Sequence, residues 1–566
     1  MYGGGARAYG QDAVSVADGN STRIEIVEIA GSSSQNPFLS IHAGESNAEN
    51  EYGDPMPQSS QASASSNVLT GYFGSVSGSD FDLTAGSAKA DGLDAVSFAE
   101  GNHLTFETAT SVSNSTLEFY GGFSAAESAS GDLQSAQASA SGNKVSGRFE
   151  SVSDSTISMF AGSAAANGQN VVSLADGNQL DLEISSLSSS DDSGDDSSDG
   201  FSVIGGNSVA DSLSVALPSV SAQASASGNE VSGRFESVSD SFISMIAGSA
   251  AAYGQKAVSS ADGNRLTFEI ATSVSNSTLD IQGGLAMAGG ASGDSQSAQA
   301  SASGNLVTGS ISGSVGQSSS LGIYGGRATA VAQDSTAVAD NNQVQLTLTL
   351  EETDGSMQLL LLGASARALT TAVADGNLLR VSGGADTEIK GTLYGAQVEI
   401  ERSDSDSAQA NASGNRVEVS GIDLTGSITG ALVENRNSSG SVNAEGNVVV
   451  ISSSTIKGDV TGANLQGSHI NAGGNTVILT EGTVVDGDVM AVVGANAGSM
   501  RFLGSDYSSV YSNNRVVMNN ATVTGAVSGV SSNSGSLPWI CRLPETLWFL
   551  PGTMKRAQLP ALKRWI

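Results

Sequence analysis

An Asn residue, in most cases preceded by Gly, recurs along almost the whole chain and divides it into units of similar length. Between Asn67 and Asn305 the successive gaps are 35, 41, 35, 51, 35 and 41 residues. Self-similarity at a fixed period is typical of solenoids, whose units bury their apolar faces only by stacking. The markers are Asn20, Asn67, Asn102, Asn143, Asn178, Asn229, Asn264, Asn305, Asn342, Asn377, Asn415, Asn447, Asn475 and Asn514.

The repeat is strict enough to locate an insertion. Residues 135–166 and 221–252 differ at only three of 32 positions. A second kind of unit alternates with this one, as LTFETATSVSNSTL from Leu104 and LTFEIATSVSNSTL from Leu266. The 51-residue gap contains the run SSSDDSGDDSSDG, which ends at Gly200. We therefore expect an acidic loop at about 186–200 inside one continuous domain.

Each unit contains three short segments with the pattern of a strand. Apolar residues alternate with polar ones after the marker, as at Leu180, Leu182 and Ile184, and again after a Ser/Asp/Asn turn, as around Ile157. A third segment, rich in Ala and Ser, precedes Asn143. A period of two buries one face of a strand and solvates the other. No segment has helical periodicity.

Three strands per unit predict an all-β fold, a single elongated parallel β-helix (β-solenoid) with about one three-strand coil per 28–41-residue repeat over residues 1–530. Gly and Asn tolerate the left-handed backbone that a sharp corner requires. Stacked Asn side chains can also form amide ladders between coils. Fourteen coils spaced by about 4.8 Å would form a rod roughly 65 Å long.

Composition agrees with a thin, extended core. The chain has 70 Gly, and only 5% of its residues are aromatic and 14% charged. Its 57 acidic and 23 basic residues give a net charge of −34, which disfavours nucleic acid and anionic membrane surfaces as partners. Cys541 is the only cysteine, so no disulfide forms within the chain. Residues 1–20 do not have the pattern of a signal peptide, and no apolar run is long enough to span a membrane.

A search for catalytic motifs yields no candidate catalytic or cofactor-binding residue. His42, His103 and His469 lie far apart in sequence, and no acid or nucleophile accompanies any of them in a motif. We expect them to be surface or turn histidines. Gly293-Asp294-Ser295 is similar to the nucleophile loop of some serine-protease passengers, but lacks the following Gly-x-Pro and lies in a Ser/Gly turn. The sequence therefore favours a protein that is not an enzyme and needs no cofactor.

The acidic residues leave two possibilities open. Several carboxylates occupy polar positions of alternating strands, which predicts that they lie on a solvated face; they include Asp181, Glu183, Glu269 and Asp280. However, β-helix enzymes that act on polysaccharides also use clustered carboxylates. The acidic loop could collect Ca²⁺, but it matches no EF-hand loop, so metal binding is not assigned. Its carboxylates are Asp191, Asp192, Asp195, Asp196 and Asp199.

From about residue 440 the repeat simplifies to NVVVISSSTIKGDVTGA, NTVILTEGTVVDGDVMAVVGA and NRVVMNNATVTGAVSGV. These segments resemble the Gly-Asn-rich repeats of type V autotransporter passengers, and the resemblance covers most of residues 1–530. It implies a right-handed β-helix that a C-terminal barrel carries to the bacterial cell surface. Adhesion to host or bacterial surface glycans or proteins is the commonest role of such passengers. The chain departs from the family pattern in lacking both signal peptide and barrel.

Two alternatives to a passenger rod remain open: a carbohydrate-active β-helix enzyme and the head of a trimeric autotransporter adhesin. Residues 6–20 and 327–342 are similar to the Ala-x-Ala-x-Gly, Ser-x-Ala pattern of trimeric heads. Those heads repeat about every 14 residues, whereas the period here stays near 35 to 41, so a monomeric rod is preferred.

Both ends suggest an interrupted coding sequence. Residues 1–20 align without gaps to 159–178 and 245–264, so Met1 occupies an internal repeat position. Residues 531–566 form a non-repeat tail that holds all three Trp, the only Cys and four of the eight Pro, with five bases against Glu545. We expect this tail to be frameshifted or mostly disordered, and the repeats to reach the cell surface only as part of a longer protein.

Overall fold

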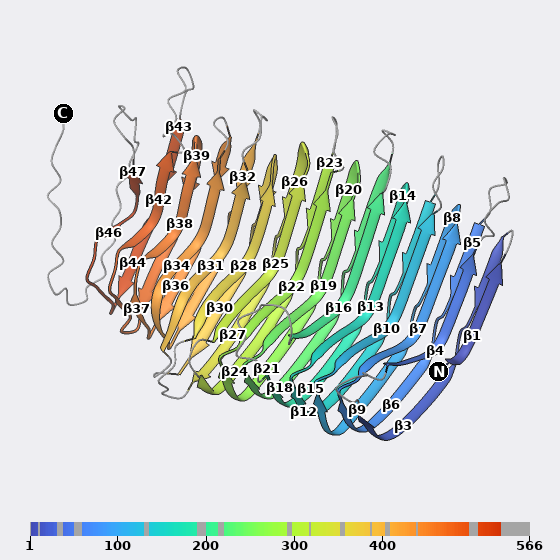
Figure 1. The fold of residues 1–566 in the computed structure, drawn as a ribbon. Coiled ribbons are helices and arrows are strands. Elements are labelled where there is room, and N and C mark those ends of the chain that lie inside the picture. Colours follow the sequence, from blue (N-terminus) through green and yellow to red (C-terminus); the bar gives the residue numbers. More distant parts are fainter. Residues whose placement is uncertain are drawn as a thin grey trace, which may run out of the picture.

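The structure, a computed structural model, shows a solenoid of parallel strands that winds through three sheets, and none of the residues it describes is helical (Figure 1). The described residues are 2–9, 12–30, 38–49, 59–128, 135–189, 200–212, 220–290, 297–315, 319–350, 357–384, 388–401, 408–436, 440–496 and 508–533.

Sheet A is the largest sheet, with 19 strands. Its strands are long through most of the rod and divide into shorter pairs from β37 onward. They are β1 (Tyr2–Tyr9), β4 (Phe38–Glu49), β7 (Asp80–Gly92), β10 (Thr116–Ser128), β13 (Thr156–Gly168), β16 (Gly200–Ser212), β19 (Phe242–Tyr253), β22 (Thr278–Gly289), β25 (Ser320–Val331), β28 (Gln358–Ala368), β31 (Glu388–Ile400), β34 (Asp423–Asn435), β37 (Thr455–Lys457), β38 (Val460–Gly467), β41 (Val484–Val485), β42 (Val489–Asn496), β45 (Thr522–Val523), β46 (Val527–Ser528) and β47 (Ser531–Asn533).

Sheet B contains 14 short strands. They are β2 (Ala13–Val16), β5 (Ser59–Ser63), β8 (Asp94–Phe98), β11 (Ser135–Ser139), β14 (Asn170–Leu174), β17 (Ser221–Ser225), β20 (Lys256–Ser260), β23 (Ser297–Ser301), β26 (Asp334–Val338), β29 (Thr371–Val373), β32 (Gln409–Asn411), β35 (Ser441–Asn443), β39 (His469–Gly473) and β43 (Ser508–Ser512).

Sheet C also contains 14 strands. They are β3 (Ser21–Ala30), β6 (Val68–Ser77), β9 (His103–Ser113), β12 (Lys144–Ser153), β15 (Gln179–Ser188), β18 (Glu230–Ser239), β21 (Arg265–Ser275), β24 (Leu306–Val315), β27 (Gln343–Leu350), β30 (Leu378–Gly383), β33 (Arg416–Ser420), β36 (Val448–Ser452), β40 (Thr476–Thr480) and β44 (Arg515–Asn519).

The chain visits the sheets in the order A, B, C and then begins the next coil, so one chain supplies all three sheets. Each of the fourteen Asn markers stands immediately before a sheet C strand. The predicted parallel β-solenoid, with one three-strand coil per repeat, is thereby confirmed. The small-residue segment before each marker is sheet B, and the segment near Ile157 is β13. The right-handedness of the helix stays a prediction.

The markers form a continuous ladder inside the rod. From Asn20 to Asn514, the main-chain N–H and the side-chain Nδ2 of each Asn donate to Oδ1 of the next, at 2.8–3.1 Å and 2.9–3.2 Å. The preceding Gly adopts the positive φ that the corner requires, for example 65° at Gly177 and Gly228. The expected amide ladder is therefore present.

Sheet A bends at its middle, where two successive residues face the interior. Ala161 and Gly162 of β13 are both buried, which breaks the period of two. A Cβ on Gly162 would lie 2.1 Å from the carbonyl oxygen of Ala140 and 2.5 Å from Nδ2 of Asn178. The middle of the sheet A strand therefore packs directly on the corner between sheets B and C, where only the absence of a side chain leaves room.

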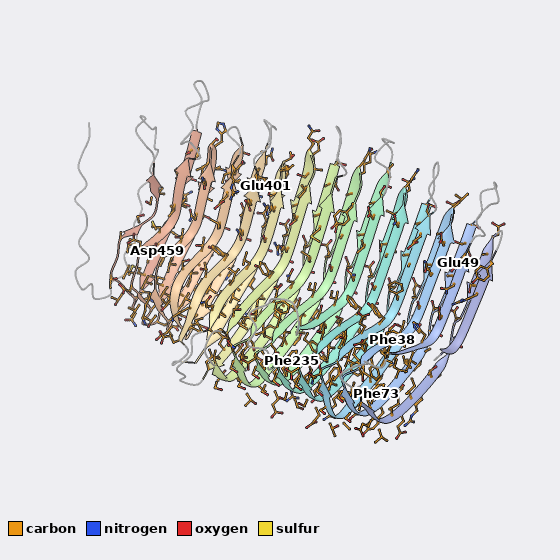
Figure 2. The ribbon with its side chains drawn as sticks, viewed as in Figure 1. Phe38, Glu49, Phe73, Phe235, Glu401 and Asp459 are labelled. Atoms are coloured by element: carbon orange, nitrogen blue, oxygen red, sulfur yellow. The ribbon has the colours of Figure 1, made fainter. Side chains whose placement is uncertain are left out.

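The bend divides the interior into two cores. Large side chains of sheet C and of the first half of sheet A form one core, in which the rings of Phe106 and Phe119 stack with centroids 4.0 Å apart. Alanines of sheet B and of the second half of sheet A form the other core. In Figure 2, Phe73 and Phe235 lie toward the lower edge with the first core, whereas Glu49 and Glu401 lie toward the opposite edge.

The outer face of sheet A is the concave side of this bent cross-section. In one coil, β10 supplies 13 residues, whereas β11, its corner and β12 span the 19 residues from 135 to 153 on the other side. The shorter path lies on the inside of a bend. The solvent-facing side chains of sheet A consequently converge on one another along the rod.

Carboxylates at the corner between sheets B and C occur mainly in every second coil. Asp176 N–H donates to Ser141 Oγ at 3.2 Å, and Asp176 Oδ1 accepts from Ser227 N–H at 2.7 Å. Because Ser and Asp alternate from coil to coil at this corner, the negative charges of successive aspartates lie two coils apart. The alternation is interrupted where two adjacent coils both carry an aspartate at the corner: Asp375 N–H donates to Asp340 Oδ1 at 2.7 Å.

The described strands extend as far as Asn533. The boundaries of the repeat region, of the acidic loop and of the tail stay predictions. Residues 190–199 of the acidic loop and residues 534–566 of the tail lie outside the described residues.

Candidate functional site: the outer face of sheet A

A row of bulky side chains follows the bend of sheet A on its concave outer face, one from each of eight successive coils. Most of them are half-buried, and Gln282 and Leu362 are buried. Backbone pairing places them in register from β10 to β31. The bend row consists of Tyr120, Phe160, Ile204, Ile246, Gln282, Tyr324, Leu362 and Tyr394.

Ring contacts and charges organise this row. The rings of Tyr120 and Phe160 stack with centroids 5.1 Å apart and planes 5° apart, and the Arg327 guanidinium lies 5.6 Å from the centre of the Tyr324 ring. Burial, together with the negative charges of Glu118 and Asp82, raises the pKa of Tyr120 to about 12. The phenol is therefore a neutral hydroxyl group at physiological pH, able to donate and accept hydrogen bonds.

Asp280 lies beside the row on β22. Burial raises the pKa of its carboxyl, while a hydrogen bond from Gln282 and the charge of Arg327 act in the opposite direction. Gln282 Nε2 donates to Asp280 Oδ2 at 3.0 Å. The alternation of the strand predicts a solvated Asp280, like the other acids in such positions, but the structure shows it half-buried on the concave face.

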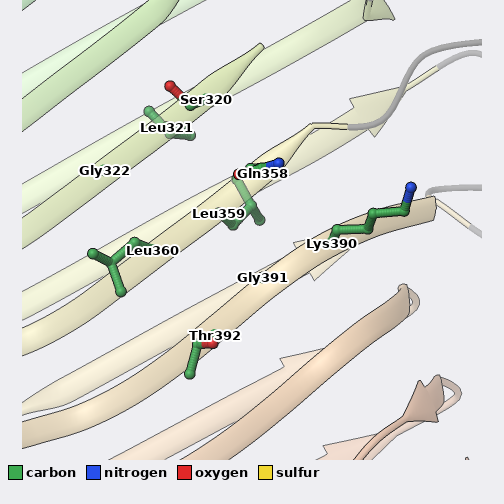
Figure 3. Close-up of a pocket in the computed structure, with 9 residues that line it drawn as sticks. All are labelled: Ser320, Leu321, Gly322, Gln358, Leu359, Leu360, Lys390, Gly391 and Thr392. Carbon is green, nitrogen blue, oxygen red and sulfur yellow. The ribbon is translucent and has the colours of Figure 1, made fainter. Parts of the chain in front are cut away.

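A depression of about 560 Å³ continues the face over β25, β28 and β31 (Figure 3). Glycine creates the space: a Cβ on Gly322 would have no neighbour closer than 3.8 Å, so nothing fills that position. Gly391, with φ of 149°, passes so close to the Leu359 backbone that a Cβ would lie 2.0 Å from its carbonyl oxygen. The lining residues are Ser320, Leu321, Gly322, Gln358, Leu359, Leu360, Lys390, Gly391 and Thr392.

The depression offers both an apolar surface and polar donors. Leu360 is 40% exposed, high for a leucine in a strand. Around it, Ser320, Gln358, Lys390 and Thr392 supply two hydroxyl groups, an amide and an ammonium. An apolar patch with a few convergent polar groups is the usual composition of a ligand site, and this mixture suits a ligand rich in hydroxyl groups.

The structure corrects the expectation that no acid or nucleophile accompanies any of the histidines. His42 Nε2 lies 2.9 Å from Ser40 Oγ and 3.9 Å from Asp82 Oδ2 of the next coil. In a Ser-His-Asp relay the acid and the serine face different ring nitrogens. Here one nitrogen faces both groups, so the cluster does not have relay geometry.

The other two histidines lie on different sheets. His103 begins β9, and burial and the charge of Lys144 lower the pKa of its imidazole. His469 begins β39 of sheet B. The histidines are thus dispersed over the rod, as expected from their separation in sequence.

The remaining predicted residues fall into two groups. Asp181, Glu183 and Glu269 are exposed on the outer face of sheet C, as expected, and Glu183 and Glu269 lie 3.7 Å from Arg148 and Arg234 of neighbouring coils. Gly293-Asp294-Ser295 and the five aspartates of the acidic loop lie outside the described residues. Within the described ranges, no three His, Cys, Asp or Glu residues are grouped closely enough to hold a metal ion.

Sequence reasoning missed the bend row, although a signal for it exists. A pair of small residues recurs at the middle of each long sheet A segment: Ala-Gly or Gly-Gly in most of them, as at 121–122, 161–162 and 247–248, and Gly-Ala at 363–364, 395–396 and 430–431. At such a pair two successive residues face inward, so the alternation of inward and outward side chains shifts by one residue. The residue before the pair belongs to the bend row.

None of the described segments is a helix long and apolar enough to cross a membrane. Comparison with known proteins finds no matching family model, no matching curated protein and no matching solved structure.

Proposed function

We propose that this chain is a surface-exposed, non-enzymatic adhesive region of an autotransporter-like passenger, and that it binds glycans or proteins of host, matrix or neighbouring cells through the outer face of sheet A. The observation that carries the proposal is the bend row together with the adjoining depression. A row of similar side chains over eight coils extends about 34 Å at the strand spacing of 4.8 Å, which suits an elongated ligand.

The surface chemistry favours a polyhydroxylated ligand over an apolar one. Leu360 and the ring of Tyr324 supply apolar contact, while Tyr120, Ser320 and Thr392 supply hydroxyl groups. The fold supports the same role mechanically. Its backbone hydrogen bonds run along the rod from coil to coil, so the binding face is held rigidly and loses little conformational entropy on binding.

A binding array of glycans and matrix proteins tests the proposal, with the wild-type chain, Leu360→Asp and Tyr72→Asp. Leu360 and Tyr72 are both 40% exposed, but Tyr72 lies on sheet C. We expect Leu360→Asp to lose binding and Tyr72→Asp to keep it. Binding that survives Leu360→Asp would exclude the depression as the site. Absence of any ligand on the array, with turnover of a polysaccharide, would overturn the adhesive function.

One feature favours the alternative of a carbohydrate-active enzyme. Asp82 and Glu118 occupy paired outward positions on adjacent coils of sheet A, beside Tyr120. Paired carboxylates are the catalytic groups of most glycoside hydrolases. A polysaccharide-cleavage screen of the wild type and Asp82→Asn decides this point, because product release that the substitution abolishes would assign catalysis to the pair.

A further inference from the structure

The outer face of sheet B has fewer charged side chains than the outer faces of the other two sheets, within the residues that the structure describes. Its strands present two outward rows, which contain Val96 and Phe98 respectively; we call these two rows the sheet B strip. From β2 to β35, all of which the structure describes, the strip contains no Asp, Glu, Lys or Arg. Charged side chains near it, such as Asp94 and Lys256, stand at the starts of strands.

Apolar residues are exposed on this strip at regular intervals. In the first row Val and Gln alternate over the first eight coils, as in Val96, Gln137 and Val172. In the second row Phe98 is followed by Ser139 and then by Leu174. Phe98 is 40% and Leu174 37% exposed, although both lie in regular strands. In the N-terminal part of the strip an apolar pair recurs on every second coil, at a period of about 9.6 Å: Val14 with Val16, Val96 with Phe98, and Val172 with Leu174.

We infer that a second copy of this chain packs on the sheet B strip, so that two rods associate side by side. The net charge of −34 means that two copies repel each other, and only an uncharged face allows close approach. The outer faces of the other sheets carry charges along the rod, such as Arg148 and Glu183 on sheet C and Glu118 and Glu399 on sheet A. An uncharged, exposed strip on such a molecule is complementary chiefly to itself.

The size and the period of the strip agree with this partner. The outer face of sheet B from β2 to β35 consists of twelve strands of three to five residues. At about 4.8 Å per strand and about 3.3 Å per residue it measures about 800 Å² per copy, comparable with the roughly 800 Å² per partner of a stable interface. Two identical strips that pack in parallel have the same two-coil period over their first five coils, so the apolar pairs of one copy can face those of the other there. A symmetric pair uses the same patch on both subunits.

This association lies beyond the proposed adhesive function, which uses sheet A, and it replaces the expectation of a monomeric rod. The corner carboxylates beside the strip, such as Asp176, repel their counterparts across the contact. Association should therefore strengthen with ionic strength, because salt screens this repulsion and strengthens apolar contacts.

Sedimentation of the full chain over a wide concentration range, at low and high salt, tests the inference. We expect a monomer–dimer equilibrium that shifts toward dimer in high salt. Phe98→Asp should weaken the dimer by about a hundredfold or more, because it places like charges opposite each other in the contact. Tyr72→Asp, equally exposed at 40% but on sheet C, is the matched control and should dimerise normally.

Leu174→Asp supplies a second, independent substitution on the strip, and circular dichroism reports whether each variant keeps its strands. Folded Phe98→Asp and Leu174→Asp chains that dimerise as the wild type does would overturn the inference, as would a wild type that stays monomeric at every concentration and salt. Because sheet A is untouched by these substitutions, glycan or protein binding on the array reports separately on the proposed function.

Discussion

Asn178 and Asn229, 51 residues apart in sequence, are joined in the same way as the markers of ordinary repeats. The main-chain N–H of Asn178 donates to Asn229 Oδ1 at 2.8 Å, and Asn178 Nδ2 donates to the same oxygen at 3.1 Å. Between Asn143 and Asn178, only 35 residues apart, the two distances are 2.9 and 3.1 Å. The hydrogen-bond distances in the ladder therefore do not depend on the length of the chain between its members, and an insertion leaves the corner unchanged.

We expect Asn229→Ala to destabilise the centre of the rod. The substitution removes the acceptor of two buried donors of Asn178, and leaving a buried donor unpaired costs about 1–3 kcal/mol for each group. Hydrogen exchange measures the effect locally, because unfolding of a long repeat protein need not be two-state. Protection of the Asn178 amide and its neighbours should fall.

Asn443→Ala is the matched control for that substitution. Asn443 belongs to an outer Asn ladder on sheet B, in which its Nδ2 donates to Asn411 Oδ1 at 3.0 Å. Water replaces that bond when it is lost, so protection should change little. Equal loss of protection in the two variants would show that the buried position of the inner ladder is unimportant.

Gly248→Ala tests the bend of sheet A. The new Cβ would lie 2.1 Å from Ala226 O and 2.5 Å from Asn264 Nδ2, so either the strand or the ladder must move. Overpacking of this kind costs about 1–3 kcal/mol, and the melting temperature should fall. Gly322→Ala is the control, because its Cβ meets nothing within 3.8 Å. A melting temperature unchanged by Gly248→Ala would mean that the close contact is not required.

The fold was largely predictable because its main determinants are local. A left-handed corner at Gly-Asn and a period of two in the following strand can be seen in any single repeat, and Leu180 and Leu182 are buried as that period predicts. The bend was not predictable in the same way. Ala161 and Gly162 both face inward because the Asn178 corner packs against them, and that contact lies across the coil.

Prediction of the proposed binding face would have required the register between coils, which the sequence leaves undetermined. Asp82 pairs with Ser40 across 42 residues, and Leu360 with Gly322 across 38, because the loops between them differ in length. The cluster at His42 and the depression at Gly322 thus arise from stacking alone. The histidines and acids were visible in the sequence, but their neighbours were not.

Asp340→Asn tests the adjacent carboxylates at the corner. Burial raises the pKa of Asp340, and burial with the charge of Asp340 raises the pKa of Asp375. A raised folded-state pKa means that the folded state binds protons more tightly than the unfolded state. Its contribution to stability is fully present below the unfolded pKa near 3.8 and is lost as the pH rises through the raised value. The wild type therefore carries a penalty at pH 7 that disappears on acidification.

We expect Asp340→Asn to melt at a higher temperature than the wild type at pH 7, with the difference vanishing toward pH 4. The amide oxygen can still accept the hydrogen bond from Asp375 N–H, which is 2.7 Å long in the wild type. Asp176→Asn is the control, since its ladder neighbours are Ser141 and Ser227 and no carboxylate adjoins it. An equal gain in both variants, or a gain that grows at low pH, would contradict the assignment.

Gly322→Leu separates the shape of the depression from its polarity. A leucine side chain at this outward position would occupy the space above Leu360 without adding charge, and the backbone at Gly322 does not have the positive φ that would strain it. We expect the variant to fold and melt as the wild type does, but to bind the array ligand about tenfold or more weakly, because the ligand loses its contact with Leu360.

Gly322→Ala leaves most of the space open and should bind nearly as well as the wild type. Titration of the three proteins with one glycan identified on the array measures the difference. Equal affinity of the wild type and Gly322→Leu would place the ligand elsewhere, and a loss shared by Gly322→Ala would point to a backbone effect and not to filling of the depression.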